Sequence, residues 1–224
     1  LVRDMARSAP RRVTVGSDAP GAATDFGVQE GWFVRGRQRL APRSILPLPG
    51  RHNEIDALAA LALAEAMGVA PEAAIEGFAS FQGLPHRVET VAVRADGVRF
   101  IDDSKGTNVG ATIAALAGFD APVILIAGGD GKGQSFAPLA QAAHGRVRLA
   151  LLIGRDAPAL EAAFAQAGVP ARRCASLPEA VALADAVAHP GEAVLLSPAC
   201  ASFDAYRNFE ERGRHFKSLV EALP

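Results

Sequence analysis

Cysteine is scarce in this sequence, with Cys174 and Cys200 the only two among 224 residues. Two cysteines are too few for a disulfide framework or a four-cysteine zinc site. The five histidines also lack the spacing of metal ligands. We therefore expect two free thiols and no metal site in this chain.

Long apolar runs and an excess of basic charge are also missing. No stretch approaches the roughly 20 apolar residues that span a bilayer, and the N-terminus has no signal-peptide pattern. The formal net charge is -1 at pH 7, and the arginines and lysines are scattered instead of forming a basic stripe. These absences argue against membrane and nucleic acid as partners. The 50% content of hydrophobic residues predicts a globular protein, which we place in the cytoplasm.

The chain begins at Leu1 instead of an initiator methionine, and we interpret it as a fragment of a longer protein. Short β-like pieces at residues 13–15, 31–34 and 45–46 are broken by glycine, proline and aspartate. This pattern predicts hairpins at the edge of a sheet, too small to fold alone.

Two helices are expected next. Residues 52–67 are rich in alanine and leucine and end at Gly68, and a second helix begins with Pro71 in its first turn. Gly83-Leu84-Pro85 then reads as a linker. We therefore predict two domains, residues 1–84 and residues 85–224.

From His86 onward, apolar runs of strand length alternate with longer helical patterns. The expected strands are residues 88–93, 98–101, 123–127, 149–153 and 194–196, with a further one at 171–175. The expected helices are residues 109–117, 136–143, 157–167, 178–188 and 208–223. This alternation predicts a doubly wound α/β domain with a mainly parallel sheet. In such sheets ligands bind beyond the carboxyl ends of the strands.

Polar residues gather directly after three of these strands. Residues 102–108 follow the expected strand 98–101 and contain carboxylates, Lys105, hydroxyls and the start of a helix. Such a segment predicts an anion site. The alternative is purely structural, with Thr107 or Asn108 as a helix cap and Asp103 as a partner of the helix dipole.

The second polar segment is Gly128-Gly129-Asp130-Gly131-Lys132-Gly133. Its glycines let backbone approach a ligand, and Lys132 adds a positive charge. It is not a Walker phosphate loop, because Gly133 stands where the hydroxyl that holds magnesium would be, and the glycine spacing does not match the dinucleotide fingerprint. The alternative is a plain glycine-rich turn.

The third segment, Ser197-Pro198-Ala199-Cys200-Ala201-Ser202-Phe203, is made of small residues that leave room for a ligand. Cys200 is either a nucleophile or a small buried thiol, and no motif places a histidine beside it. His52 and Asn53 could cap a helix, and Arg87 could be a surface charge.

Five strings, in this order, resemble the C-terminal half of the Mur ligases. They are Gly50-Arg51-His52-Asn53, Gly83-Leu84-Pro85-His86-Arg87, Asp103-Ser104-Lys105-Gly106-Thr107-Asn108, Gly128-Gly129-Asp130-Gly131-Lys132 and Ser197-Pro198-Ala199-Cys200-Ala201-Ser202-Phe203-Asp204. The last two favour the members of the family that add D-glutamate.

The resemblance implies that residues 1–84 are the remnant of a central ATPase domain and that residues 85–224 are a whole Rossmann-like ligase domain. The reaction it implies is the ATP-dependent addition of D-glutamate to UDP-N-acetylmuramoyl-L-alanine in peptidoglycan precursor synthesis, through an acyl phosphate. Positioning and charge stabilisation would then carry the catalysis. A monomer is expected.

The resemblance also assigns residues. His52, Asn53 and Asp56 would lie on the adenine side, Arg87 near the phosphates, Asp103 near the ribose and Lys105 facing the transferred phosphate, with Lys105 and Arg87 catalytic. The positions that would hold D-glutamate are Thr107, Asp130, Lys132, Ser202 and Phe209. Asp56 departs from the family, which usually has asparagine there, and Gly106 replaces a common alanine, an exchange expected to change little.

The family's phosphate loop, magnesium ligands and carbamylated lysine would all lie upstream of Leu1, so this polypeptide is expected to be inactive alone. Two other interpretations remain open. One is a ligase similar to folylpolyglutamate synthase, and the other is a non-catalytic Rossmann-like module that binds a nucleotide or an amino acid.

Overall fold

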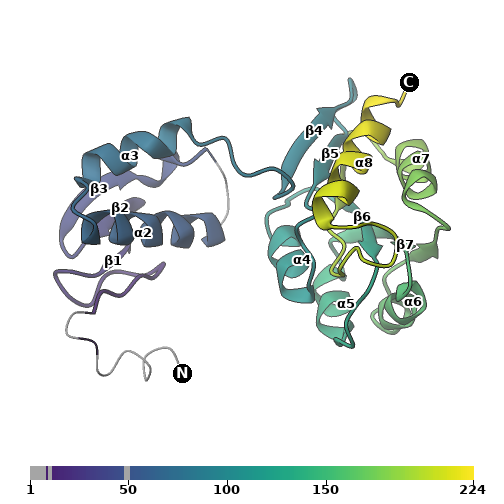
Figure 1. Cartoon of the computed structure of the whole chain (residues 1–224), viewed down its shortest axis with the longest axis horizontal. Coiled ribbons are helices and arrows are strands. Elements are labelled where there is room, and N and C mark those ends of the chain that lie inside the picture. The colour runs from purple at the N-terminus through teal and green to yellow at the C-terminus, as the bar shows by residue number, and fades with distance from the viewer. Residues whose placement is uncertain (1–8, 10–11, 48–50) are drawn as a thin grey trace. The chain divides into compact units, whose positions relative to one another are not determined.

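The computed structural model describes residue 9 and residues 12–47 and 51–224, without the side chain of His52. The chain divides into two compact units, Leu1–Gln82 and Gly83–Pro224 (Figure 1). Within the described residues, every helix falls short of the length and apolar character that crossing a bilayer requires.

The first unit combines a small sheet with two helices. Strands β1 (Phe26–Gln29), β2 (Trp32–Arg35) and β3 (Gln38–Pro42) form an antiparallel sheet in that order. A single turn of 3-10 helix, η1 (Arg43–Ile45), precedes α2 (Arg51–Ala66) and α3 (Pro71–Ser80). Buried residues of the sheet, such as Phe26 and Phe33, pack with Leu58 and Leu61 of α2 to form its core.

The predicted helices of this unit are confirmed. Helix α2 ends two residues before Gly68, whose φ of 84° is easiest for a residue without a Cβ. Helix α3 begins with Pro71, where the missing N–H has no helical partner to lose.

The predicted strands of this unit are mostly wrong. Of residues 13–15, only Val15 makes an isolated bridge, to Phe26, and Ile45 ends η1 instead of forming a strand. Strand β2 does cover most of residues 31–34, and the two-residue hairpin before it places Glu30 and Gly31 at φ 50° and 79°. Two consecutive left-handed residues match the twist of a tight hairpin.

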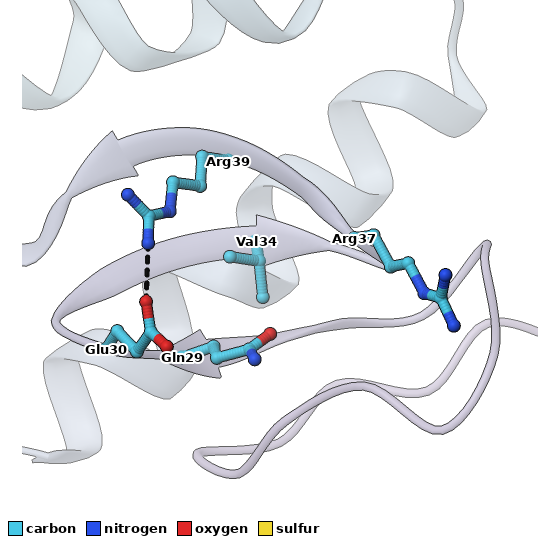
Figure 2. Close-up of a pocket in the computed structure, with 5 residues that line it drawn as sticks. All are labelled: Gln29, Glu30, Val34, Arg37 and Arg39. Atoms are coloured by element: carbon cyan, nitrogen blue, oxygen red, sulfur yellow. Dashed lines mark hydrogen bonds and ion pairs between the residues drawn. The ribbon is translucent and has the colours of Figure 1, made fainter.

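The sheet of the first unit carries a shallow hollow lined by Gln29, Glu30, Val34, Arg37 and Arg39 (Figure 2). Arg39 Nη2 and Glu30 Oε2 form an ion pair of 2.5 Å across it. None of the predicted site residues lines this hollow.

The second unit is built on a six-stranded sheet in the order β4-β5-β9-β6-β7-β8. Its strands are β4 (Glu89–Val93), β5 (Arg99–Asp102), β6 (Val123–Gly128), β7 (Val147–Ile153), β8 (Ala171–Arg173) and β9 (Ala193–Leu196). Only β4, at one edge, runs antiparallel to its neighbour. The predicted fold class, a doubly wound and mainly parallel sheet, is confirmed.

Helices cover both faces of this sheet (Figure 1). One face packs against α4 (Val109–Leu116), α5 (Ala137–Ala143) and α6 (Ala157–Gln166), and the other against α7 (Leu177–Val187) and α8 (Phe209–Glu221). Adjacent residues of the central strands alternate between the two cores: Leu125 and Leu195 face the first, whereas Ile126 and Leu196 face the second. Burial on both faces explains why these strands are continuous apolar runs.

Strand β9 lies between β5 and β6, although it comes last in the chain. Leu196 is in register with Asp102 of β5 and with Ile126 of β6. The carboxyl ends of three neighbouring strands therefore meet, and the chain reverses its winding direction there. Such a switch point is where ligands bind in open α/β sheets.

Candidate functional site

Three loops leave the ends of these strands: the β5 loop (residues 103–108), the β6 loop (residues 129–136) and the β9 loop (residues 197–208). Asp130 of the β6 loop and Ala201 of the β9 loop exchange two backbone hydrogen bonds, of 2.9 and 2.8 Å. All three polar segments predicted from the sequence are therefore neighbours.

Gln134 connects the β6 loop to its neighbours through its side-chain amide. Its Nε2 donates to the carbonyl of Ala199 at 2.6 Å, and its Oε1 accepts from the amide of Val109, the first residue of α4, at 3.0 Å. Asn108 caps the same helix by accepting from the amide of Ala111 at 2.9 Å. The capping role weighed for Asn108 is confirmed.

Asp103 is 6% exposed and belongs to a buried polar network. Ser197 Oγ donates to Asp103 Oδ2 at 2.6 Å, and the hydroxyls of Ser197 and Thr112 lie 3.0 Å apart. Burial raises the pKa of Asp103 to about 6, although the hydrogen bond from Ser197 acts in the opposite direction. Asp103 thus anchors the start of the β5 loop to the start of the β9 loop.

Gly106 packs directly on this network. A methyl group there would lie 2.6 Å from Asp103 Oδ2 and 2.7 Å from Ser197 Oγ, which is closer than side-chain carbons approach. An alanine at this position would require the side-chain oxygens of Asp103 and Ser197 to shift, and the expectation that the exchange changes little stays a prediction.

Lys105 and Phe209 come together above the β5 loop. The Lys105 ammonium lies 3.9 Å from the centre of the Phe209 ring, a cation–π contact. Phe209 is the first residue of α8, and Ser104 Oγ donates to its carbonyl at 2.8 Å. Thr107 is half-buried on the same loop.

The β6 loop presents Lys132 to solvent. Asp130 holds the loop, since its Oδ1 accepts from the Lys132 amide at 3.0 Å and its Oδ2 pairs with Arg155 at 3.2 Å. Gly128 and Gly129 have φ angles of 125° and 128°, and added Cβ atoms would clash with the backbone of Ile153 and Ala201. The glycines are thus required by close backbone packing.

The β9 loop contains Ser202, which is 2% exposed, and Cys200, which is fully buried. Burial raises the pKa of the Cys200 thiol to about 12, so it stays protonated at neutral pH. Of the two interpretations of Cys200, the buried structural thiol fits the structure and the nucleophile does not.

Arg212 of α8 is a buried residue that the sequence analysis missed. It is 1% exposed, and its guanidinium donates to Ser104 Oγ at 3.0 Å, to the Ser104 carbonyl at 2.9 Å and to the Cys200 carbonyl at 3.2 Å. Burial lowers its pKa to about 10, which leaves it charged at neutral pH. Its place in one stripe with Phe216 and Val220, at helical spacing, was the available signal.

The segment before β4 is strained beside the site. His86 and Val88 have φ angles of 64° and 49°, which are unfavourable for side chains, and above all for a β-branched one. Arg87 between them is exposed, while His86 is buried and its Nδ1 lies 2.6 Å from Asp102 Oδ2. The charge of Arg87 opposes the rise in the pKa of Asp103.

The predicted adenine-side residues belong to the first unit, on α2. Asn53 is half-buried and Asp56 is exposed, while the side chain of His52 lies outside the described residues.

The described side chains show whether this chain contains a group of ligands that could bind a magnesium ion. In the described part of the chain, one group of potential ligands converges, namely His86, Glu89 and Asp102. These atoms already pair, His86 with Asp102 and Glu89 with Lys217 at 2.6 Å, and a ring nitrogen suits magnesium poorly. This group does not fit a magnesium ion.

Comparison with known proteins adds close relatives. The family model "Mur ligase, glutamate ligase domain" matches residues 86–200. UDP-N-acetylmuramoylalanine--D-glutamate ligase from Aromatoleum aromaticum is 52% identical over 100% of this chain and 50% of its own length. The enzyme of the same name from Thiobacillus denitrificans is 49% identical over 99% of this chain and 47% of its own. The chain spans about half the length of the curated relatives it matches.

Solved structures share the fold at low identity. A bifunctional folylpolyglutamate synthase/dihydrofolate synthase from Yersinia pestis matches 98% of this chain and 50% of its own, with a TM-score of 0.65 and 20% identity. A pseudomurein peptide ligase type C from Methanothermus fervidus matches 90% of this chain and 42% of its own, with a TM-score of 0.64 and 16% identity. With the family model matching residues 86–200 and the three loops converging as described, the chain belongs to the Mur ligase family.

Proposed function

We propose that this chain is the part of a cytoplasmic ATP-dependent ligase that binds D-glutamate and covers ATP, in an enzyme that joins D-glutamate to UDP-N-acetylmuramoyl-L-alanine for peptidoglycan synthesis. The observation that carries the proposal is identity of 46 to 52% to ligases of that name, along nearly the whole chain. Residues 1–84 would close the central ATP-binding domain, and residues 85–224 would form the ligase domain.

ATP would supply the phosphoryl group that activates the acceptor carboxylate. The residues of this chain would then position charge instead of forming a bond, which agrees with the protonated state of Cys200. We assign Arg87, Asp103 and Lys105 to the nucleotide side, together with His52, Asn53 and Asp56 of the first unit. The magnesium ligands would come from elsewhere in the whole enzyme.

The D-glutamate side would consist of Thr107, Asp130, Lys132, Ser202 and Phe209. Lys132 is the most informative of these, because its φ of 53° is a left-handed conformation that glycine adopts at lower cost. A lysine at such a position supports a role for its ammonium. In the described part of the chain that ammonium has no ion pair, so it is available to a ligand carboxylate.

Replacing Lys132 by alanine in the full-length enzyme is expected to raise the KM for D-glutamate by about tenfold to a hundredfold, with a much smaller effect on the KM for ATP. A charge-assisted hydrogen bond contributes about 1.5 to 3 kcal/mol, which corresponds to this range. Ser202→Ala should weaken D-glutamate binding less, because a neutral hydrogen bond contributes about 0.5 to 1.5 kcal/mol. Steady-state kinetics with each substrate varied in turn measures both effects.

Two variants serve as controls. Lys132→Arg keeps the charge and should retain most of the affinity, and Arg146→Ala removes an exposed cation at the amino end of β7, away from the loops. A defect confined to ATP in Lys132→Ala would instead make the β6 loop a nucleotide phosphate loop.

The folylpolyglutamate synthase fold is the second candidate, since two such enzymes match with TM-scores of 0.62 and 0.65. Identities of 16 to 20% show only a shared fold, which is why we favour the first proposal. A ligation assay of the full-length protein decides between them. We expect product with UDP-N-acetylmuramoyl-L-alanine and D-glutamate, and none with a reduced folate and L-glutamate. Failure with both substrate pairs would favour a non-catalytic binding module.

A further inference from the structure

Lys105 is a cation that its surroundings leave without an acidic partner. It is half-buried, and within the described residues it makes no ion pair. The nearby carboxylates have other partners: Asp102 binds His86, Asp103 accepts from Ser197, and Glu89 pairs with Lys217. Its closest partner is the face of the Phe209 ring, 3.9 Å from the ammonium.

An aromatic ring face binds an ammonium group in a different way than a carboxylate group does. The attraction is between the charge and the quadrupole of the ring, so it restrains the nitrogen while the net charge remains available. The ammonium has three N–H donors, and the ring does not occupy all of them. Lys105 is thus held in place and still able to bind an anion.

The Phe209 ring is held in turn by the His86 ring. The His86 ring meets Phe209 edge to face, with centroids 6.2 Å apart and an interplanar angle of 81°. Asp102, which is fully buried, holds His86 Nδ1 at 2.6 Å. Gly213 packs against the same imidazole so closely that an added Cβ would clash with it.

Backbone hydrogen bonds also connect Lys105 and Phe209 to the segments around them. The Lys105 amide donates to the His86 carbonyl at 3.1 Å, and the Phe209 carbonyl accepts from Ser104 Oγ at 2.8 Å. Movement of His86 would therefore displace the lysine and the ring together.

We propose that the side chain of Phe209 is a positioning residue that holds the Lys105 ammonium on its ring face, and that the buried His86–Asp102 pair fixes the ring. The kinetic consequence rests on the proposed ligase function, in which Lys105 meets the transferred phosphate. The spectroscopic consequence does not, because it concerns the contact alone.

The sequence makes a direct measurement simple, since Lys105, Lys132 and Lys217 are its only lysines. In the 224-residue chain labelled with ¹³C-lysine, the ring current of Phe209 should move the ε-methylene protons of Lys105 upfield of those of exposed Lys132. Phe209→Leu should remove this shift, Phe209→Trp should keep it, and His86→Asn should reduce it. Phe203→Leu, which changes an exposed ring on the β9 loop, should leave it unchanged.

In the full-length enzyme, Phe209→Leu should lower kcat about tenfold, the effect of losing one partly desolvated cation–π contact. Phe209→Trp should restore most of the rate, which a purely space-filling role would not predict. Coincident Lys105 and Lys132 signals in the wild-type chain, or a Lys105 signal unchanged by Phe209→Leu, would overturn the proposal. A third outcome is that Phe209→Leu removes the shift while no full-length protein, wild type included, has ligation activity. That outcome would count against the ligase function and leave the contact established.

Discussion

Replacing Arg212 by alanine is expected to lower the free energy of unfolding of the second unit by about 4 kcal/mol. The change leaves the Ser104 and Cys200 carbonyls without their charged donor, and a buried unsatisfied group costs about 1 to 3 kcal/mol. It also empties the volume of a large buried side chain. Because these bonds join the β5 loop to the β9 loop, we expect the proposed binding of ATP and D-glutamate by the full-length enzyme to weaken too.

Intrinsic fluorescence separates this effect from changes in the first unit. The chain has one tyrosine, Tyr206, in the second unit and one tryptophan, Trp32, in the first. A urea titration of Arg212→Ala should shift the Tyr206 transition and leave the Trp32 transition in place. Arg214→Ala, an exposed neighbour on the same helix, should change stability by less than about 0.5 kcal/mol. A loss below about 1 kcal/mol in Arg212→Ala would show that water replaces the guanidinium at little cost.

Replacing Asp103 by asparagine is expected to change how stability depends on pH. The folded pKa of about 6 lies above the ordinary value of 3.8, so between these two values the folded protein binds more protons than the unfolded chain. The free energy of unfolding therefore falls as the pH rises through this window, by about 3 kcal/mol for this group. Asparagine does not titrate, so Asp103→Asn should gain stability relative to wild type by about that amount between pH 4 and pH 7.

Urea titrations at pH values across this window, followed by Tyr206 emission, measure the difference between variant and wild type. Asp120→Asn, the same change at an exposed position, is the matched control. A difference that stays constant with pH for Asp103→Asn would mean that folding does not raise the pKa of this carboxyl.

The parts of the fold that could be predicted are those whose signals are local. Helix α2 has a continuous helical pattern and a glycine stop, and the buried strands of the second unit are apolar runs bounded by turns. Strands β1 and β3 of the first unit are absent from the sequence-based prediction because they mix apolar and polar residues and have no continuous apolar run. What defines β1 is pairing and packing, with Gly27 pressed against the Asp18 carbonyl, and sequence patterns do not report such contacts.

The candidate site divides in the same way. Its loops could be predicted, because polar residues after parallel strands collect at one edge of the sheet. The buried network of Asp103, Ser197 and Thr112 could not, since Ser197 is 94 residues from Asp103 and 85 from Thr112 along the chain. Nor could the tight packing of Gly106, which depends on where the Ser197 hydroxyl points.

The central position of β9 determines when the site can form as the chain folds. Ala193 of β9 pairs with both Arg99 and Val123, so β5 and β6 become neighbours of one strand only after most of the chain has been made. Contacts between such distant segments are slow to form, because a long loop must close first. Until then two apolar strand edges stay unpaired, and such edges promote association between chains. A nascent chain that has not yet reached β9 should therefore depend on protection from aggregation, and the loops of the candidate site should be the last part of this unit to take shape.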